Sequence, residues 1–441
     1  MSERIVKYIL VSIMLVAFGT GVFAQSGANS LYSPYSVFGI GDLYTQGTAY
    51  NKTMGGIGIA GRDVRYINYV NPAAIAARDT LSVMFDVSLS EGNKRFEQSN
   101  YKSANNTFNI NDIAVSIPIW KSLTATLGIT PFSSVGYDYS YYVDDPELIG
   151  NTGGVTYTSN GSGSIYQGFF GAAANIGRRF SVGGQLLYYF GNIDKDTKVD
   201  FSLSGYRGIA SGYTLQLNSL GGKFGVQYQQ PLGDKYLTLG ATYRTSSKLK
   251  GYITDYDQAS IGSLVDTLYN RVDSLAHSGK VKISSELGFG ISFRKPDKWS
   301  VEVDYLMSNW NNSNMNSTTG LSNIANDVAF STTRSQSVRA GFEFIPNRND
   351  IRYYLRTCSY RMGGYWKREY YKLDGNTVDA FGVTFGMTLP IVRRDRYNGL
   401  TLGVDLGQRG SLTGNMTRER YVNFVIGFNI HDLWFIKPRY D

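Results

Sequence analysis

Residues 420–428 read Arg-Tyr-Val-Asn-Phe-Val-Ile-Gly-Phe and predict a β-strand with two different faces. Side chains alternate between the two faces of a strand, so a period of two places one set of residues together. The residues on one predicted face are all apolar: Val422, Phe424, Ile426 and Phe428. The other face carries Tyr421, Asn423, Val425 and Gly427, which are mixed in polarity and mostly small. Similar stretches recur back to about Leu81 and predict an all-β domain.

About fourteen such strands are predicted, an even number that suits an antiparallel β-barrel. Their alternation is regular, for example where apolar Val338 and Phe342 flank Arg339 and Gly341. The predicted ranges are 81–90, 107–118, 121–135, 163–177, 180–192, 213–229, 235–251, 280–293, 298–309, 333–345, 352–366, 376–390, 398–409 and 418–429.

The connections between these strands distinguish a membrane barrel from a soluble one. Short turns at 118–121, 177–180, 230–235, 294–298 and 346–351 alternate with long polar connections at 91–106, 138–162, 193–212, 252–279 and 310–332. Outer-membrane barrels have tight periplasmic turns and large outer loops. Trp120, Trp299 and Trp434 fall at the predicted periplasmic ends, and Trp310 and Trp366 at the outer ends, where aromatic girdles lie. The pattern predicts a transmembrane antiparallel barrel in the outer membrane of a Gram-negative bacterium.

The N-terminal part does not read as strands. Residues 1–24 have a basic start and a short apolar run, which favours a signal peptide over an uncleaved anchor. Residues 25–80 contain apolar side chains together with glycine-rich and proline-containing stretches, and we expect a plug inside the lumen. A flexible periplasmic tail is the alternative. The barrel is then expected over 81–430 and a periplasmic tail over 431–441.

Residues for catalysis are scarce in this chain. The only histidines, His277 and His431, have no recognisable nucleophile partner, and Cys358 is the one cysteine. No cluster of cysteine and histidine offers a zinc site. The sequence therefore predicts no enzyme, no metal and no cofactor. The net charge is +8, but the basic residues are scattered over turns, which does not favour nucleic-acid binding.

Six charged residues are expected to face the lumen: Arg244, Glu302, Asp304, Arg339, Glu343 and Asp405. They are candidates to pair with one another and to hold the plug, and plain lumen polarity is the alternative. The predicted periplasmic turns carry further basic residues: Arg178, Arg179, Lys295, Lys298, Arg393, Arg394 and Arg396. These turns and the 431–441 tail could meet outer-membrane lipid, or an acidic outer-membrane or periplasmic protein.

Pro131 lies inside the third predicted strand, in the stretch 128–136 that ends at Gly136. Proline has no N–H to donate to the strand ladder, so it marks a bulge or a break in a closed barrel. We expect a lateral opening toward lipid near this residue. Continuous pairing of the second, third and fourth strands there would contradict this hypothesis.

These features resemble the long-chain fatty acid transporter family of the FadL type over most of the mature chain. The resemblance rests on Asn71-Pro72-Ala73 after the glycine-rich segment with Gly55 and Gly56, and on the interrupted third strand. It implies that hydrophobic small molecules bind in the lumen and leave through the wall after a plug shift. It also implies that Asn71, Pro72 and Ala73 belong to the plug, and Pro131 and Gly136 to the kink.

Two functions therefore remain open. The first is a passive transporter of hydrophobic small molecules, which requires a continuous apolar path. The second is a non-transporting structural subunit of an outer-membrane protein secretion or assembly complex, as in PorV-like barrels of the type IX secretion system. It requires a blocked lumen and contacts with partner proteins.

Overall fold

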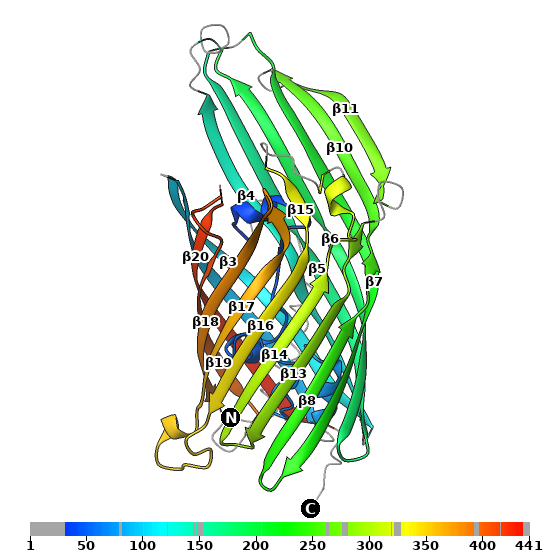
Figure 1. The fold of residues 1–441 in the computed structure, drawn as a ribbon, viewed down its shortest axis with the longest axis vertical. Helices are drawn as coiled ribbons and strands as arrows, with labels where there is room; N and C mark the ends of the chain where they lie inside the picture. Colours follow the sequence, from blue (N-terminus) through cyan, green and yellow to red (C-terminus); the bar gives the residue numbers. More distant parts are fainter. Residues whose placement is uncertain are drawn as a thin grey trace, which may run out of the picture.

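Fourteen antiparallel strands close into a barrel in the computed structural model of this chain (Figure 1). The structure describes residues 31–78, 82–99, 101–120, 122–143, 147, 153–203, 205–261, 264–275, 281–318, 320–321, 328–391, 397–414 and 416–434. The predicted signal peptide, His277 and the arginines 393, 394 and 396 lie outside these residues. The predicted domain boundaries at 24, 80 and 430 stay predictions.

Each barrel strand pairs with the next one along the chain, and the last strand pairs with the first. In the closing pair, Ser82 lies opposite Leu433. The barrel strands are β2 (Ser82–Gln98), β3 (Tyr101–Trp120), β4 (Leu123–Val143), β5 (Val155–Ile176), β6 (Phe180–Phe201), β7 (Gly208–Leu232), β8 (Lys235–Arg244), β13 (Glu286–Lys295), β14 (Trp299–Asn309), β16 (Arg334–Phe344), β17 (Ser359–Leu373), β18 (Asn376–Pro390), β19 (Gly399–Arg409) and β20 (Arg418–Leu433). The predicted barrel of about fourteen strands is confirmed.

The two faces of β20 have the exposure that a lipid-facing wall requires. Phe424 and Ile426 are 46% and 41% exposed on the outer face, whereas Val425 between them is 6% exposed. The same contrast recurs around the barrel, where leucine, valine and phenylalanine form the outer surface. Such a continuous apolar exterior would be costly in water and is stable in hydrocarbon. None of the helices among the described residues has the length and apolar content needed to cross a membrane.

Several expected outer loops are instead strands that extend past the membrane. Ranges 91–106, 138–162 and 193–212 belong largely to β2–β7, and 252–279 contains the hairpin of β10 (Lys250–Ile261) and β11 (Leu264–Ser274). Figure 1 shows this hairpin projecting above the barrel beside β7. Polar residues occur on both faces of these extensions, including the buried Lys195. The period of two in hydrophobicity that identifies a half-buried strand is therefore absent. Small elements complete this side: β9 (Ser247–Lys248), β12 (Lys282–Ile283), η3 (Met315–Ser317) and β15 (Phe330–Thr332).

The opposite end of the barrel has short turns, which is typical of the periplasmic end of outer-membrane barrels. Among the described residues, the turns 177–179, 233–234 and 296–298 connect adjacent strands there. Trp120 ends β3 and Trp299 begins β14 at this level, as expected for an aromatic girdle. The prediction for Trp310 is wrong, because its side chain is buried and packs 4.8 Å from the ring of Tyr370.

One predicted turn on the periplasmic side is longer than expected. The strand expected from residue 352 begins only at Ser359, so the turn after β16 runs over 345–358 and contains η4 (Tyr354–Arg356). The last barrel strand likewise runs beyond the expected end and reaches Leu433. Of the predicted 431–441 tail, residues 435–441 lie outside the described part of the chain.

Residues 31–78 form a segment inside the barrel, named here the lumen segment. It contains η1 (Pro34–Val37), β1 (Asp42–Leu43), α2 (Ala49–Lys52) and η2 (Pro72–Ala77), and it appears in dark blue within the ring of strands in Figure 1. The short helix expected at Pro72 is present as a 3-10 helix, and the Asn71 side chain accepts a hydrogen bond from the Ala73 amide. Most of its apolar side chains are buried.

The close approach of the lumen segment to β17 gives a test of its position. A methyl group on Gly363 would lie 2.3 Å from the Gly55 nitrogen, whereas one on the adjacent Gly364 would meet nothing nearer than 3.6 Å. We expect Gly363→Ala to lower the free energy of unfolding by about 1–3 kcal/mol through overpacking. Gly364→Ala, on the opposite face of the same strand, is the control. Denaturant unfolding in detergent measures both, and equal values would contradict the fold of the segment.

Candidate functional site

The lumen segment is joined to the barrel wall at the periplasmic end by a buried group of charges. This inner ion cluster comprises Asp63 and Arg65 of the segment with Arg294, Glu343 and Arg361 of the wall. Glu343 accepts hydrogen bonds from Arg65 and from Arg361, the latter at 2.9 Å. Asp63 lies 3.4 Å from Arg294. Because almost all of these side chains are buried, each charge depends on its partners in place of water.

A second buried group of charges joins the segment to the wall in the outer half of the barrel. This outer ion cluster comprises Asp42 of the segment with Glu369, Arg409 and Glu419 of the wall. The Arg409 guanidinium lies 2.6 Å from carboxylate oxygens of both Asp42 and Glu419, and it also donates to the Ser33 hydroxyl at 2.6 Å. A single guanidinium therefore connects the segment to β19 and β20.

Between the two clusters, wall side chains bind the backbone of the segment. The Asp304 carboxylate accepts hydrogen bonds from the amides of Gly58 at 2.7 Å and Ile59 at 2.9 Å. The Arg339 guanidinium donates to the Gly56 carbonyl at 2.7 Å. Asp304 and Arg339 are opposite each other in the β14–β16 register, yet both direct polar atoms to the segment.

The predicted plug-motif residues have identifiable contacts. Gly55 and Gly56 have φ of 73° and 80°, a left-handed conformation that glycine adopts without strain. The Gly55 amide donates to the Thr384 hydroxyl at 2.8 Å. The Asn71 side-chain amide donates to the Ile59 carbonyl at 2.6 Å, which ties η2 to the glycine-rich stretch. Pro72 and Ala73 pack on the wall at Gly183, which has no room for a side chain.

Of the remaining predicted lumen charges, Arg244 and Asp405 bind side chains of the wall. Arg244 lies 3.5 Å from Glu286 of the neighbouring strand. Asp405 accepts hydrogen bonds from Tyr365 at 2.9 Å and from Asn423 at 3.1 Å. Glu302 is buried, and among the described residues its Oε2 atom has no hydrogen-bond partner. A functional role for these six residues stays a prediction.

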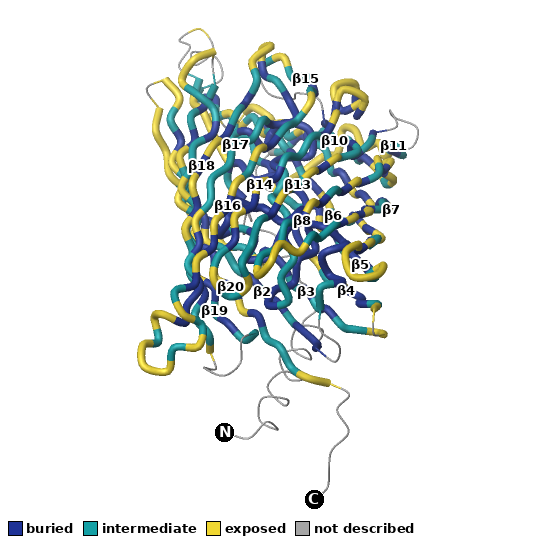
Figure 2. The backbone as a smooth tube through the Cα atoms, turned by 60° about the horizontal axis from the view of Figure 1, so that its bottom comes forward, coloured by how far each residue is buried: buried dark blue, intermediate teal, exposed yellow. Residues whose placement is uncertain are grey.

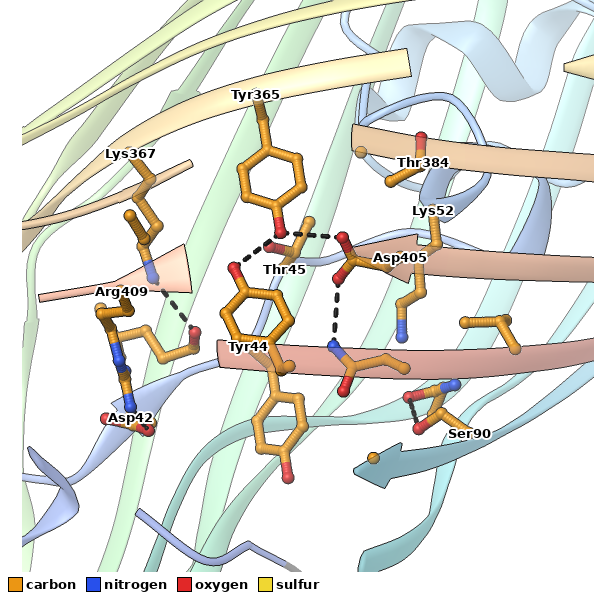
Figure 3. Close-up of a pocket in the computed structure, with 18 of the residues that line it drawn as sticks. Asp42, Tyr44, Thr45, Lys52, Ser90, Tyr365, Lys367, Thr384, Asp405 and Arg409 are labelled. Atoms are coloured by element: carbon orange, nitrogen blue, oxygen red, sulfur yellow. Dashed lines mark hydrogen bonds and ion pairs between the residues drawn. The ribbon is translucent and has the colours of Figure 1, made fainter. Parts of the chain in front are cut away.

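A cavity of about 240 Å³ lies between the segment and the inner faces of β2, β3 and β16–β20. Figure 3 shows Lys52, Tyr365 and Asp405 around this space. The lining is dominated by charged and hydroxyl- or amide-bearing side chains: Asp42, Lys52, Lys94, Asn109, Asn111, Arg339, Tyr365, Lys367, Glu369, Thr384, Asp405, Arg409, Glu419, Tyr421 and Asn423. Binding sites for apolar molecules are lined mostly by hydrophobic side chains, and this cavity is not.

The barrel wall is interrupted at the predicted kink. Pairing between β3 and β4 runs from Trp120–Leu123 to Ile113–Ile129 and ends there, so the outer part of β3 has no register with β4. The β4–β5 register shifts between Pro131 and Ser133. The pairing is therefore not continuous at Pro131, and a lateral opening at this position stays a prediction.

Beyond Ile129, where β3 no longer pairs with β4, the lumen segment pairs with that edge of β4. Because β5 pairs with the other edge of β4, the partners of β1 on β4, Ser133 and Ser134, lie on the vacated edge. Three further hydrogen bonds follow the same edge: Tyr44 N–H to the Phe132 carbonyl, Ser33 N–H to the Gly136 carbonyl and Gln46 Nε2 to the Pro131 carbonyl. The segment thus replaces a neighbouring strand along the interruption.

Sequence reasoning identified Glu343 of the inner ion cluster but missed the other members of both clusters. Arg409 and Glu419 lie two residues beyond the alternating sets that predict the inner faces of β19 and β20. Extending the period of two by one step would have found them. Asp63, Arg65 and Asp42 belong to a segment without periodicity, so no comparable pattern points to them.

Comparison with known proteins identifies both a family and a fold. A family model described as BamG matches residues 5–441. Among curated proteins, no sequence matches this chain. The matching solved structures include a toluene transporter, TbuX, from Ralstonia pickettii, with 16% identity, a TM-score of 0.55 and coverage of 87% of this chain and 98% of that one.

Two further solved structures share the fold. A FadL homologue from Pseudomonas aeruginosa has 9% identity and a TM-score of 0.57, with coverage of 89% of this chain and 99% of that one. The toluene transporter TodX from Pseudomonas putida has 13% identity and a TM-score of 0.54, with coverage of 91% and 100%. The resemblance to FadL-type barrels is confirmed at the level of the fold, and the chain is an outer-membrane protein of Gram-negative type.

Removing the guanidinium of the outer ion cluster tests its contribution to stability. We expect Arg409→Met to lower the free energy of unfolding by about 3–5 kcal/mol, because buried carboxylates lose their partner. Arg368→Met is the control, since the Arg368–Asp379 pair is about one-third exposed and should contribute at most about 1 kcal/mol. Guanidinium unfolding followed by tryptophan fluorescence measures both variants. A loss of similar size in both would show that the outer cluster does not hold the segment.

Proposed function

The chain belongs to the BamG family, and we propose that it is a non-conducting barrel that serves as a structural subunit of an outer-membrane protein secretion or assembly complex. The observation that carries this proposal is the occupied lumen. The lumen segment is bound to the wall through the inner and outer ion clusters and through the backbone contacts between them.

The energy needed to empty the lumen supports a structural role. Separating a buried ion pair so that its charges stay buried and unpaired costs about 3–5 kcal/mol, so releasing both clusters without letting water reach these charges costs on the order of 6–10 kcal/mol. At 1.4 kcal/mol per factor of ten, the released state is populated below about one molecule in 10⁴. A passive channel that must release its segment to conduct would be closed almost all of the time.

The polar lining of the cavity also supports a structural role over the transport of hydrophobic molecules. An apolar ligand in this space would remove water from Lys52, Lys94 and Asp405 without offering hydrogen bonds in exchange. Burying a charged group without a partner costs several kcal/mol, which exceeds the gain from burying a few apolar carbons. The cavity is suited to water or small polar solutes, and the continuous apolar path required for hydrophobic transport has no counterpart in its lining.

Passive transport of hydrophobic small molecules with lateral release is the second candidate. Two observations favour it: the interruption between β3 and β4 at Pro131, and a fold shared with proteins named as toluene transporters. In this case β1 would leave the β4 edge and an apolar molecule would pass between β3 and β4 into lipid.

Purification from native membranes tests the structural role directly. The tagged barrel, extracted from outer membranes in gentle detergent, is expected to carry other outer-membrane or periplasmic proteins in fixed stoichiometry. Quantitative mass spectrometry of the protein and lipid in the sample provides the measurement. A barrel that purifies alone, with fatty acids or aromatic compounds bound, would refute the structural role and support transport.

A disulfide across the interruption distinguishes the two functions in one molecule. Leu43 and Ser133 are directly opposite each other in the β1–β4 register, so cysteines at these two positions are expected to form a disulfide. In a Cys358→Ser background, Leu43→Cys/Ser133→Cys should leave complex formation unchanged when oxidised. If the barrel is a transporter, oxidation should instead reduce uptake of toluene or oleate at least tenfold, and reduction with dithiothreitol should restore it.

A further inference from the structure

Residues 346–358, named here the 346–358 turn, form most of the long connection after β16, and this connection differs from the other fully described turns at this end of the barrel. Those turns have two or three residues, whereas this one has room for the short helix η4. Figure 1 shows it extending from the lower left of the barrel, and Figure 2 shows that it is largely exposed. A longer turn at the periplasmic end is unusual for barrels of this class, which keep these connections short.

The turn presents large apolar side chains to the solvent. Ile351 is 88% exposed, Leu355 is 62% exposed and Tyr353 is 48% exposed. Their exposure is not explained by contact with lipid hydrocarbon. Phe344 pairs with Trp299, which marks the aromatic girdle, and the chain continues from there toward the periplasm. Three large apolar residues within five positions of a water-facing turn form a patch of the kind that binds other proteins.

The turn is held in one conformation by its own hydrogen bonds. The Asp350 carboxylate accepts hydrogen bonds from the amides of Arg352 and Tyr353, both at 2.8 Å. These amides, that of Tyr353 first, hold the pKa of the Asp350 carboxyl below its usual value. The Asn347 amide donates to the Arg356 carbonyl at 2.8 Å, which closes the base of the turn. A pre-formed surface loses little conformational entropy when it binds.

Basic side chains surround the apolar patch. The turn carries three arginines against one aspartate. Arg348 is largely buried beside Asp297, whereas Arg352 and Arg356 are exposed, and Arg356 lies 3.5 Å from Asp350. The guanidinium groups of Arg352 and Arg356 lie 5.3 and 4.8 Å from the centre of the Tyr353 ring. Tyrosine and arginine next to exposed aliphatic side chains are the residue types that contribute most to protein interfaces. A complementary surface must offer an apolar pocket and carboxylates at its edge.

We propose that the 346–358 turn is the docking surface for a periplasmic protein domain, which receives Ile351 and Leu355 in an apolar pocket bordered by aspartate or glutamate. The inference rests on the proposed structural function and names the surface through which that function is carried out. Its position past the girdle favours a protein in the periplasm over the lipid headgroups at girdle level.

The test uses the full-length barrel with two matched double variants. Ile351→Ser/Leu355→Ser removes the apolar patch. Ile176→Ser/Leu232→Ser is the control, because these side chains are 57% and 48% exposed at other periplasmic strand ends. Each protein is purified from native outer membranes, and each protein that accompanies the wild type in fixed stoichiometry is identified, purified and titrated against all forms of the barrel in nanodiscs.

We expect one such periplasmic partner to bind the Ile351→Ser/Leu355→Ser barrel at least tenfold more weakly than the wild type, with the control unchanged. Arg352→Glu/Arg356→Glu should also weaken binding at least fivefold, and added salt should weaken binding of the wild type. A difference in gel migration between unheated and boiled samples checks that each variant barrel is folded.

The alternative outcomes separate this inference from the proposed function. Equal binding by the wild type and the Ile351→Ser/Leu355→Ser variant would overturn the docking surface and leave the structural role intact. A wild-type barrel without any stoichiometric partner would overturn both. Loss of binding to phosphatidylglycerol vesicles in the same variant, with protein binding unchanged, would identify the turn as a lipid contact and overturn the docking surface.

Discussion

Backbone hydrogen bonding without water is the constraint on which this structure depends. At membrane depth every N–H and C=O group needs a partner within the protein, which is why the fourteen strands close and β2 pairs with β20. The interruption between β3 and β4 would violate this rule on the edge of β4. The lumen segment satisfies it there, through β1 and the adjacent contacts to Phe132 and Gly136. The segment therefore fills the lumen and also pairs with the wall as an additional short strand.

The polar interior follows from the same arrangement. A segment that bonds to the wall brings backbone amides and charged side chains into the lumen. On the wall, Asp304, Arg339 and the residues of the two ion clusters bind these groups. The result is a lumen filled by specific polar contacts. Two barrels named as toluene transporters share the fold of this chain, yet the fold alone does not determine what occupies the lumen.

The fold could be predicted from the sequence largely because one face of each strand meets lipid. That face is continuously apolar, so the alternation in β14, β16, β19 and β20 identified these strands and the charges Asp304, Arg339 and Glu343 on their inner faces. The outer extensions lack a continuously apolar face, and the sequence therefore predicts loops there. The residues that pair with the lumen charges could not be predicted from the sequence either. Arg65 and Asp42 lie in an aperiodic segment, and which strand they meet depends on the closure of the whole barrel.

The outer ion cluster joins residues that are synthesised far apart in time. Ser33 contacts Glu419 across 386 positions, and Asp42 contacts Arg409 across 367. Contacts of such sequence separation form late, since the loop between them must first be ordered. Both wall partners lie on the last two strands, and β20 also forms the closing pair with β2. Barrel closure and docking of the N-terminal segment are therefore one late folding step. A chain that lacks its final two strands leaves Ser33 and Asp42 without their partners Glu419 and Arg409.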